Sequence, residues 1–208
     1  MLYSILIAAL ASYLLGNLNG AVCVSSLVSH DDVRNHGSGN AGLTNFIRNY
    51  GGASALLVIA IDAGKAALAC LLSGLLLQPH GYYLEGTVLG GVAVMLGHDF
   101  PALLGFKGGK GILSGLLIAL CIDWRVAVLI LAVFAVVYAI TMYVSLASVL
   151  ASVAFGIGFA VLYSHNIYVL VGGVFMGLLC VFMHRANIVR LIKGQERKTN
   201  LFKKGKSA

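Results

Sequence analysis

The sequence predicts an all-α integral membrane protein of about seven transmembrane helices, with its N-terminus outside and its C-terminus in the cytoplasm. Three observations support this class. Of the 208 residues, 60% are hydrophobic and only 10% are charged, whereas a soluble domain usually carries about a quarter charged residues. Long apolar segments recur along the chain, and the basic residues fall on one side of them. The alternative, a soluble all-α protein, could not cover its surface with polar groups.

Seven apolar segments follow one another, with approximate bounds. They are residues 2–27, 52–77, 84–104, 111–122, 124–142, 146–163 and 167–183. The segment 111–122 is short, because a full span needs about 20 residues. Residues 97–101 (Gly-His-Asp-Phe-Pro) interrupt the third segment, so we expect its last turns to be broken or re-entrant.

The chain is predicted to form one transmembrane domain over residues 1–208, with a basic cytoplasmic tail at 184–208. No Lys or Arg precedes Arg34, so we interpret the first segment as a retained span and not as a cleaved signal peptide. The four cysteines lie far apart within apolar runs, without metal-ligand spacing; they are Cys23, Cys70, Cys121 and Cys180. We expect them to be small buried hydrophobic residues, with no disulfide, metal or cofactor.

Charge placement sets the predicted orientation. If seven spans follow an outer N-terminus, inner segments hold twelve of the 14 Lys and Arg residues. These are Arg34, Arg48, Lys107, Lys110, Arg185, Arg190, Lys193, Arg197, Lys198, Lys203, Lys204 and Lys206. The outer loops hold only Arg125, and Lys65 lies within a span. This asymmetry follows the positive-inside rule of a cell membrane. The net charge of +7 therefore indicates contact with anionic lipid, not nucleic acid.

Three polar stretches are predicted to lie together on the inner face. The first, residues 36–48, reads HGSGNAGLTNFIR. Glycines that adopt positive φ can aim successive N–H groups at one anion, with hydroxyl, amide and guanidinium donors around it. This pattern suits an anion site, and it suits a flexible loop of turn residues equally well.

The second stretch, residues 97–111, ends in Phe-Lys-Gly-Gly-Lys-Gly at the start of an apolar helix. A helix N-terminus with free N–H groups binds anions, and nearby lysines strengthen such a site. The spacing is not that of a Walker A loop. We favour phosphate binding over a simple basic flank, because two donor-rich loops lie on one side.

The third stretch, residues 184–198, begins His-Arg-Ala-Asn directly after the last span. Asn187 and Arg190 are three residues apart, so they share a face if this stretch is helical. A basic helix lying along anionic lipid is the alternative, and we accept it for the lysines near the end. The positions of His184 and Asn187 at the membrane edge are less easily explained that way.

Two further features carry polar groups. Asp62 and Lys65 lie three residues apart inside the second span, where charges usually face a partner or a cavity. We favour a structural ion pair over a substrate contact. Residues 141–146 form a polar joint between two spans, and a hydroxyl there either caps a helix or completes the anion site.

Several reactions are disfavoured. A hydrolase with a Ser nucleophile would need a Gly-x-Ser-x-Gly elbow, which is absent. The His-x4-Asp pattern of acyltransferases that use thioester donors is also absent from the inner face.

The three stretches resemble those of the acyl-phosphate:glycerol-3-phosphate acyltransferases, the PlsY type of membrane enzyme. The resembling pieces are GSGNAGLTNFIRNYG, GHDFPALLGFKGGKG and HRANIVRLIKGQERK, in the order and spacing of that family. Ala41 replaces the usual Pro, Gly16-Asn17-Leu18-Asn19 replaces Gly-Ser-Ile-Pro, and Asp-x-x-Lys-Gly ends in Ala66 instead of Gly. These departures concern backbone rigidity more than the phosphate donors.

The resemblance implies transfer of an acyl group from acyl phosphate to the 1-hydroxyl of glycerol 3-phosphate, giving lysophosphatidic acid and inorganic phosphate. It also implies seven spans and a cytoplasmic active site, with membrane lipids as the surroundings. The residues expected to hold one phosphate are Ser38, Asn40, Thr44, Asn45 and the backbone of Gly39.

Further roles follow as hypotheses. Arg48 and Lys107 would neutralise the phosphates and the leaving group. The turn at Gly108 and Gly109 would allow close approach of the backbone, with Lys110 in support. The residues expected to orient glycerol 3-phosphate are Ser145, His184 and Asn187. The general base is left open among His184, His36 and the phosphate of the donor itself. Because the mixed anhydride is already reactive, positioning can suffice.

Two other classes of membrane protein are the alternatives to an acyltransferase. A transporter or flippase for a phosphorylated metabolite or lipid would suit broken helices and intramembrane charges, although no inverted repeat is visible. A purely structural membrane subunit would not need two phosphate-type loops.

Overall fold

The structure, a computed structural model, describes residues 1–199, and within them the secondary structure is helical. The long helices are α1 (Leu2–Gly16), α4 (Ala55–Leu77), α5 (Tyr83–Asp99), α7 (Trp124–Thr141), α8 (Val144–Leu162) and α9 (Ile167–Met183). The shorter ones are α2 (Gly20–Ser29), α3 (Leu43–Tyr50), α6 (Ile112–Ile122) and α10 (Arg185–Ile192). Three 3-10 turns complete the set: η1 (Val33–Asn35), η2 (Gln78–His80) and η3 (Ala102–Leu104).

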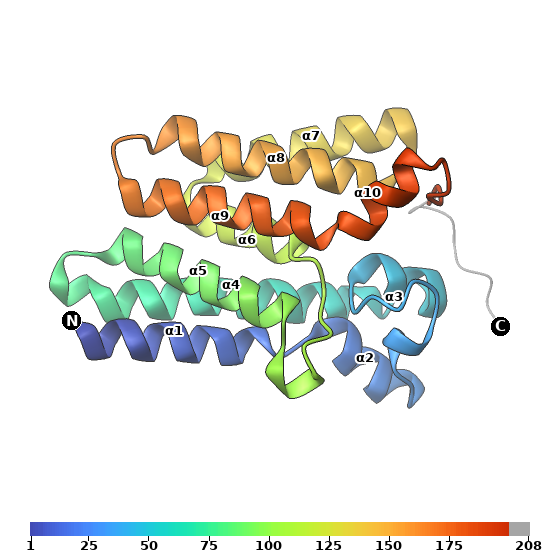
Figure 1. Cartoon of the computed structure of the whole chain (residues 1–208). Coiled ribbons are helices and arrows are strands. Elements are labelled where there is room, and N and C mark those ends of the chain that lie inside the picture. The colour runs from blue at the N-terminus through green and yellow to red at the C-terminus, as the bar shows by residue number, and fades with distance from the viewer. Residues whose placement is uncertain (200–208) are drawn as a thin grey trace.

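The long helices lie side by side in one bundle, with α1, α4 and α5 on one side and α7, α8 and α9 on the other (Figure 1). Helix α5 contacts α9, and α6 contacts both α4 and α7, so these contacts join the two sides. The N-terminus lies at one end of the bundle. Helices α2, α3 and α10 gather at the opposite end (Figure 1).

Five helical segments are long and apolar enough to cross a membrane: Leu2–Ser29, Ala55–His80, Tyr83–Leu104, Trp124–Thr141 and Val144–Leu162. Helices α9 and α10 would together form a sixth, but they meet at an angle of 54°. Helix α6 is an 11-residue apolar helix, short as predicted. The described chain is therefore an integral membrane fold, and the count of seven full spans stays a prediction.

Side-chain caps mark the starts of α2 and α7. At the break between α1 and α2, the Asn19 side chain accepts a hydrogen bond from Val22 N, at 3.0 Å, and so caps α2. Asp123 caps α7 by accepting from Arg125 N, at 2.8 Å. Helix α5 ends at Asp99, which agrees with the expected interruption at residues 97–101.

Small residues let the helices approach closely, as expected where lipid provides no hydrophobic drive between helices. A Cβ on Gly16 of α1 would lie 2.4 Å from Val94 O of α5. A Cβ on Gly97 of α5 would lie 2.1 Å from Tyr13 O of α1. Only glycine fits at either position, so the α1–α5 contact depends on both residues.

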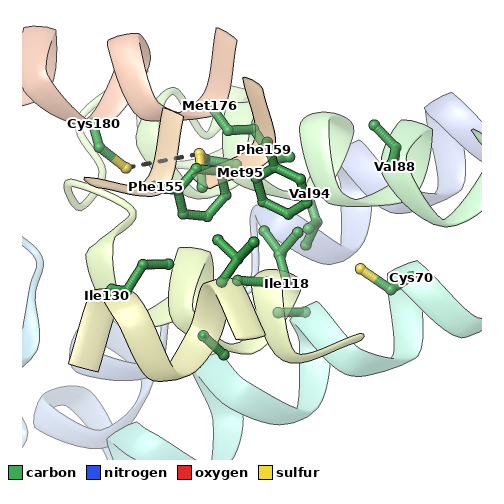
Figure 2. Close-up of a cluster of buried hydrophobic side chains, with 14 of the residues drawn as sticks. Cys70, Val88, Val94, Met95, Ile118, Ile130, Phe155, Phe159, Met176 and Cys180 are labelled. Carbon is green, nitrogen blue, oxygen red and sulfur yellow. Dashed lines mark hydrogen bonds between the residues drawn. The ribbon is translucent and has the colours of Figure 1, made fainter. Parts of the chain in front are cut away.

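The main core joins the two sides of the bundle (Figure 2). Its largest buried side chains include Met95 of α5, Ile118 of α6, Phe155 and Phe159 of α8, and Met176 of α9.

The prediction of four buried cysteines is half right. Cys70 and Cys180 are buried, but Cys23 is only partly buried and Cys121 is exposed. A thiol can face lipid as well as protein, so an apolar sequence context did not distinguish the two environments.

Candidate active site

A cavity of about 350 Å³ lies at the end of the bundle where α3 and α10 meet the long helices. All three polar stretches of the sequence contribute to it, together with the start of α8. Its polar lining residues are Ser38, Asn40, Thr44, Asn45, Arg48, Asp62, His98, Lys110, Ser145, Ser148, His184, Asn187, Arg190 and Glu196. The prediction that the three stretches meet on one face is confirmed.

The first loop is held together by the Asn45 side chain. Its Nδ2 donates to the carbonyl oxygens of Val33, His36 and Asn40 at 3.0 to 3.1 Å. Its Oδ1 accepts a hydrogen bond from Ser38 N at 3.0 Å. Asn45 is thus committed to shaping the loop, and the predicted role as a direct phosphate donor does not fit this geometry.

The backbone of this loop is also occupied. The N–H of Gly39 donates to His36 O at 3.0 Å, and Gly39 does not line the cavity. A turn within the loop uses this N–H, so its contact with a phosphate would require that turn to open and stays a prediction. The donors that remain toward the cavity are side chains, chiefly those of Ser38, Thr44 and Arg48.

The second loop presents Lys110 to the cavity. Gly109 N donates to His98 O at 3.0 Å, and a Cβ on Gly109 would lie 2.0 Å from His98 Nε2. The backbone of Gly109 thus packs closely against His98, whereas the prediction was a close approach to a phosphate. Gly108 and Lys107 do not line the cavity, and Lys107 is exposed. The lysine that faces the site is the one we expected only to support it.

The third stretch contributes a short polar network. Asn187 and Arg190 share one face of α10, as predicted, and both bind the carboxylate of Glu196, at 3.2 and 2.7 Å. Lys110 Nζ donates to Asn187 Oδ1 at 2.6 Å, which ties the second stretch to the third.

Thr199, three residues after Glu196, also contacts residues near the cavity. Arg48 donates from Nη2 to Thr199 Oγ1, and Tyr138 donates from its hydroxyl to Thr199 O at 2.9 Å. Thr199 N also donates to Met142 O at 3.0 Å. The rest of the predicted tail, including Lys203, lies outside the described residues.

Within residues 1–199, two side chains of the predicted site have a polar atom that makes no hydrogen bond. His184 Nδ1 lies 2.8 Å from Cys180 O, and a carbonyl can only accept, so Nδ1 carries the hydrogen. In the neutral ring Nε2 is then an acceptor. Ser145 Oγ is buried and, within residues 1–199, has no hydrogen-bond partner. Both groups are suited to contacting a bound hydroxyl or phosphate.

Positive charge gathers in this cavity. Burial, with Arg190 and Arg48 nearby, lowers the pKa of Lys110 to about 8 against the partial compensation of Glu196. Burial also lowers the pKa of Arg48, although a guanidinium remains charged. Three cationic side chains line a site that contains one carboxylate of the tail, Glu196, and the membrane-embedded Asp62.

Part of the cavity lining is apolar. It consists of Ile112, Leu113 and Leu116 of α6, Ile130, Leu131 and Phe134 of α7, and Val144 of α8. A hydrocarbon chain can lie against these side chains while a charged head group remains among the cations.

The sequence reasoning left five polar lining residues out of the site: Asp62, His98, Ser148, Arg190 and Glu196. Arg190 and Glu196 could have been found from their place in the third stretch, where an acidic residue follows a basic one six positions on. Asp62 and His98 stood out as polar residues of apolar segments, but only the packing of α4 and α5 brings them to the cavity, and Ser148 of α8 carried no such signal. The predicted ion pair between Asp62 and Lys65 is confirmed, at 2.8 Å.

The fold defines an integral membrane protein with a cavity at one end of a helical bundle, where cationic side chains gather. The model of the glycerol-3-phosphate acyltransferase family matches residues 6–194. The chain belongs to that family and is a membrane glycerol-3-phosphate acyltransferase of the PlsY type, an enzyme class of phospholipid biosynthesis.

Curated relatives and solved structures support the same family assignment. The glycerol-3-phosphate acyltransferase of Clostridioides difficile (strain 630) is 37% identical, over 95% of this chain and 96% of its own length. That of Neisseria meningitidis serogroup B is 35% identical, over 92% and 95%. A crystal structure of PlsY in its glycerol 3-phosphate form superimposes with a TM-score of 0.85 and 30% identity, over 96% of this chain and 100% of that one. The lysophosphatidic acid form gives 0.81 and 30%, over 95% and 96%.

Proposed function

We propose that this enzyme transfers a fatty acyl group from acyl phosphate to the 1-hydroxyl of glycerol 3-phosphate, and releases lysophosphatidic acid and inorganic phosphate. One observation carries the proposal: a cavity lined by Arg48, Lys110 and Arg190 adjoins an apolar wall of α6 and α7. Both substrates carry a phosphate, and the donor also carries a hydrocarbon chain. The cavity offers complementary groups for each part.

In this mechanism the hydroxyl oxygen attacks the acyl carbonyl carbon, and the carbonyl–phosphate C–O bond breaks. The departing phosphate gains charge, which the cations stabilise. The hydroxyl proton goes to a phosphate oxygen of the donor or to His184 Nε2. Ser145 and Asn187 orient the acceptor. Because the mixed anhydride is activated already, holding the two substrates together supplies much of the rate.

We further propose that the whole chain is one transmembrane domain in the cell membrane, with seven spans and an outer N-terminus. The three polar stretches and the basic residues of the tail would then face the cytoplasm. There a water-soluble acceptor can reach the cavity from one side while the donor remains in lipid. Labelling single cysteines introduced near residue 80 and residue 35 with a membrane-impermeant reagent tests this orientation.

The decisive assay uses purified protein in detergent, synthetic acyl phosphate and labelled glycerol 3-phosphate. We expect acylated product and inorganic phosphate in equal amounts. Acyl-CoA supplied in place of acyl phosphate tests the identity of the donor, and product formed at a similar rate from it would contradict the proposed donor. Because no vesicle gradient is present, a transporter would give no product at all.

A further inference from the structure

The ammonium group of Lys65 lies at a junction behind the cavity. Its Nζ is 2.8 Å from Asp62 Oδ1, 2.8 Å from His98 Nδ1, 2.7 Å from Leu18 O and 3.2 Å from Gly16 O. The side chains of Lys65 and Asp62 are only 1% and 3% exposed. A buried charge is costly unless it is paired and hydrogen-bonded, and this one meets four acceptors.

The ion pair matches the broken helix beside it. Lys65 contacts carbonyl oxygens at the C-terminal end of α1, where the helix dipole is negative. Asp62 Oδ1 accepts from Gly20 N at 3.1 Å, at the N-terminus of α2, where the dipole is positive. Each charge therefore satisfies the backbone groups that the break between α1 and α2 leaves without helical partners.

The same junction reaches the first loop of the site. Asn19, within the break, donates from Nδ2 to Ala41 O at 3.0 Å. Ala41 lies directly between Asn40 and Gly42, which both line the cavity. The position of the break therefore determines where the loop that carries Ser38 and Asn40 meets the cavity.

The junction also reaches the second loop through His98. A charged Lys65 can only donate, so His98 Nδ1 accepts and the neutral ring carries its hydrogen on Nε2. The Nε2 edge of the ring faces Gly109, where a Cβ would lie 2.0 Å away, and His98 O accepts the hydrogen bond of Gly109 N. The imidazole of His98 therefore packs against the backbone of Gly109, the residue that precedes Lys110.

We propose that Asp62 and Lys65, acting through His98 and the α1–α2 break, are positioning residues that hold both phosphate-binding loops in register. This inference rests on the proposed function for its substrate. It goes beyond a structural ion pair because it predicts an effect on substrate binding that stability alone would not produce.

The test removes both charges together, in Asp62→Asn/Lys65→Met, because removal of one would leave the other buried and unpaired. We expect kcat/KM for glycerol 3-phosphate to fall on the order of 10²-fold, since a displacement of about 1 Å at a reactive site costs this much. Most of the fall should be a rise in KM. The matched control is Ser73→Ala, which removes a buried hydrogen bond of 2.9 Å to Ser12 between the same helices, α1 and α4. It should change the Tm and leave KM unchanged.

A double-mutant cycle with Lys110→Met then separates positioning from stability. If the junction acts through Lys110, the double charge removal should reduce kcat/KM much less in the Lys110→Met background than in the wild type. Additive losses, or an unchanged KM in a folded variant, would overturn the proposal. Should the charge-removal variant not fold, His98→Ala keeps the ion pair; because His98 also lines the cavity, its rise in KM must become much smaller in the Lys110→Met background.

Direct binding of glycerol 3-phosphate, measured by calorimetry without any acyl donor, keeps this test independent of the donor. If the wild type binds glycerol 3-phosphate but does not use acyl phosphate, the proposed function fails while the positioning proposal is still decided by the affinities of the variants. Unchanged affinity in Asp62→Asn/Lys65→Met would refute positioning in either case.

Discussion

Lys110 should make the enzyme sensitive to mildly alkaline pH. Burial and two nearby guanidinium groups lower its pKa to about 8, from about 10.4 for a free lysine. The ammonium form is therefore lost as the pH rises through about 8. With that pKa, about nine-tenths of Lys110 is charged at pH 7 and about one-tenth at pH 9. If only the charged form holds phosphate, kcat/KM falls about tenfold for each pH unit above about 8.5.

The assay measures kcat/KM for glycerol 3-phosphate between about pH 6.5 and 10, with the uncatalysed hydrolysis of acyl phosphate subtracted. Ionisation of the phosphate of glycerol 3-phosphate does not contribute to the fall of kcat/KM at alkaline pH, because its second pKa is about 6. Lys110→Arg is the matched control, since a guanidinium stays charged throughout this range. Its profile should lack the alkaline fall. A wild-type profile that stays level to about pH 10, or the same fall in both proteins, would refute this reasoning.

Three further outcomes are expected. Arg48→Ala should lower kcat/KM by about 10²- to 10³-fold in a protein that remains folded, because a charge that stabilises the leaving phosphate is lost; a near-normal rate would exclude Arg48 from the site. Gly109→Ala places a Cβ 2.0 Å from His98 Nε2, so kcat/KM should fall at least about tenfold, and the Tm should fall as well because His98 is buried. Gly97→Ala places a Cβ 2.1 Å from Tyr13 O and should cost about 1–3 kcal/mol of stability, measured by thermal unfolding in detergent, with KM unchanged.

Much of the fold could be read from composition and order alone. The helix bounds follow the apolar segments closely, as at Ala55–Leu77 and Trp124–Thr141. This works because a membrane imposes the same solvent on every span, and only an internally hydrogen-bonded helix satisfies the backbone there. The break between α1 and α2 was not anticipated within the first segment. It depends on Lys65 and Asp62, which satisfy its backbone groups from a helix more than forty residues away.

Site residues were predictable where a polar side chain stood out from an apolar chain. Five residues that were predicted in this way line the cavity: Ser38, Arg48, Ser145, His184 and Asn187.

The choice between Lys107 and Lys110 was not predictable. Positive φ angles at Gly105, Phe106 and Gly111 determine the course of the loop, and thereby which lysine faces the cavity. Such backbone geometry depends on contacts with distant residues, among them Asn17 Oδ1, which accepts a hydrogen bond from Leu103 N at 3.0 Å.

Hydropathy and residue type are properties of each segment alone, so they predicted a membrane protein and three polar stretches on one face without knowledge of the packing. Which of their donors are used inside a loop, and which side chains reach the cavity, follows from the packing of the helices. The amide of Asn45 and the N–H of Gly39 are used within their own loop, whereas Lys110 and Arg190 converge on the cavity. A hydrogen bond needs a partner at about 3 Å with the right direction, and only the packed helices supply that information.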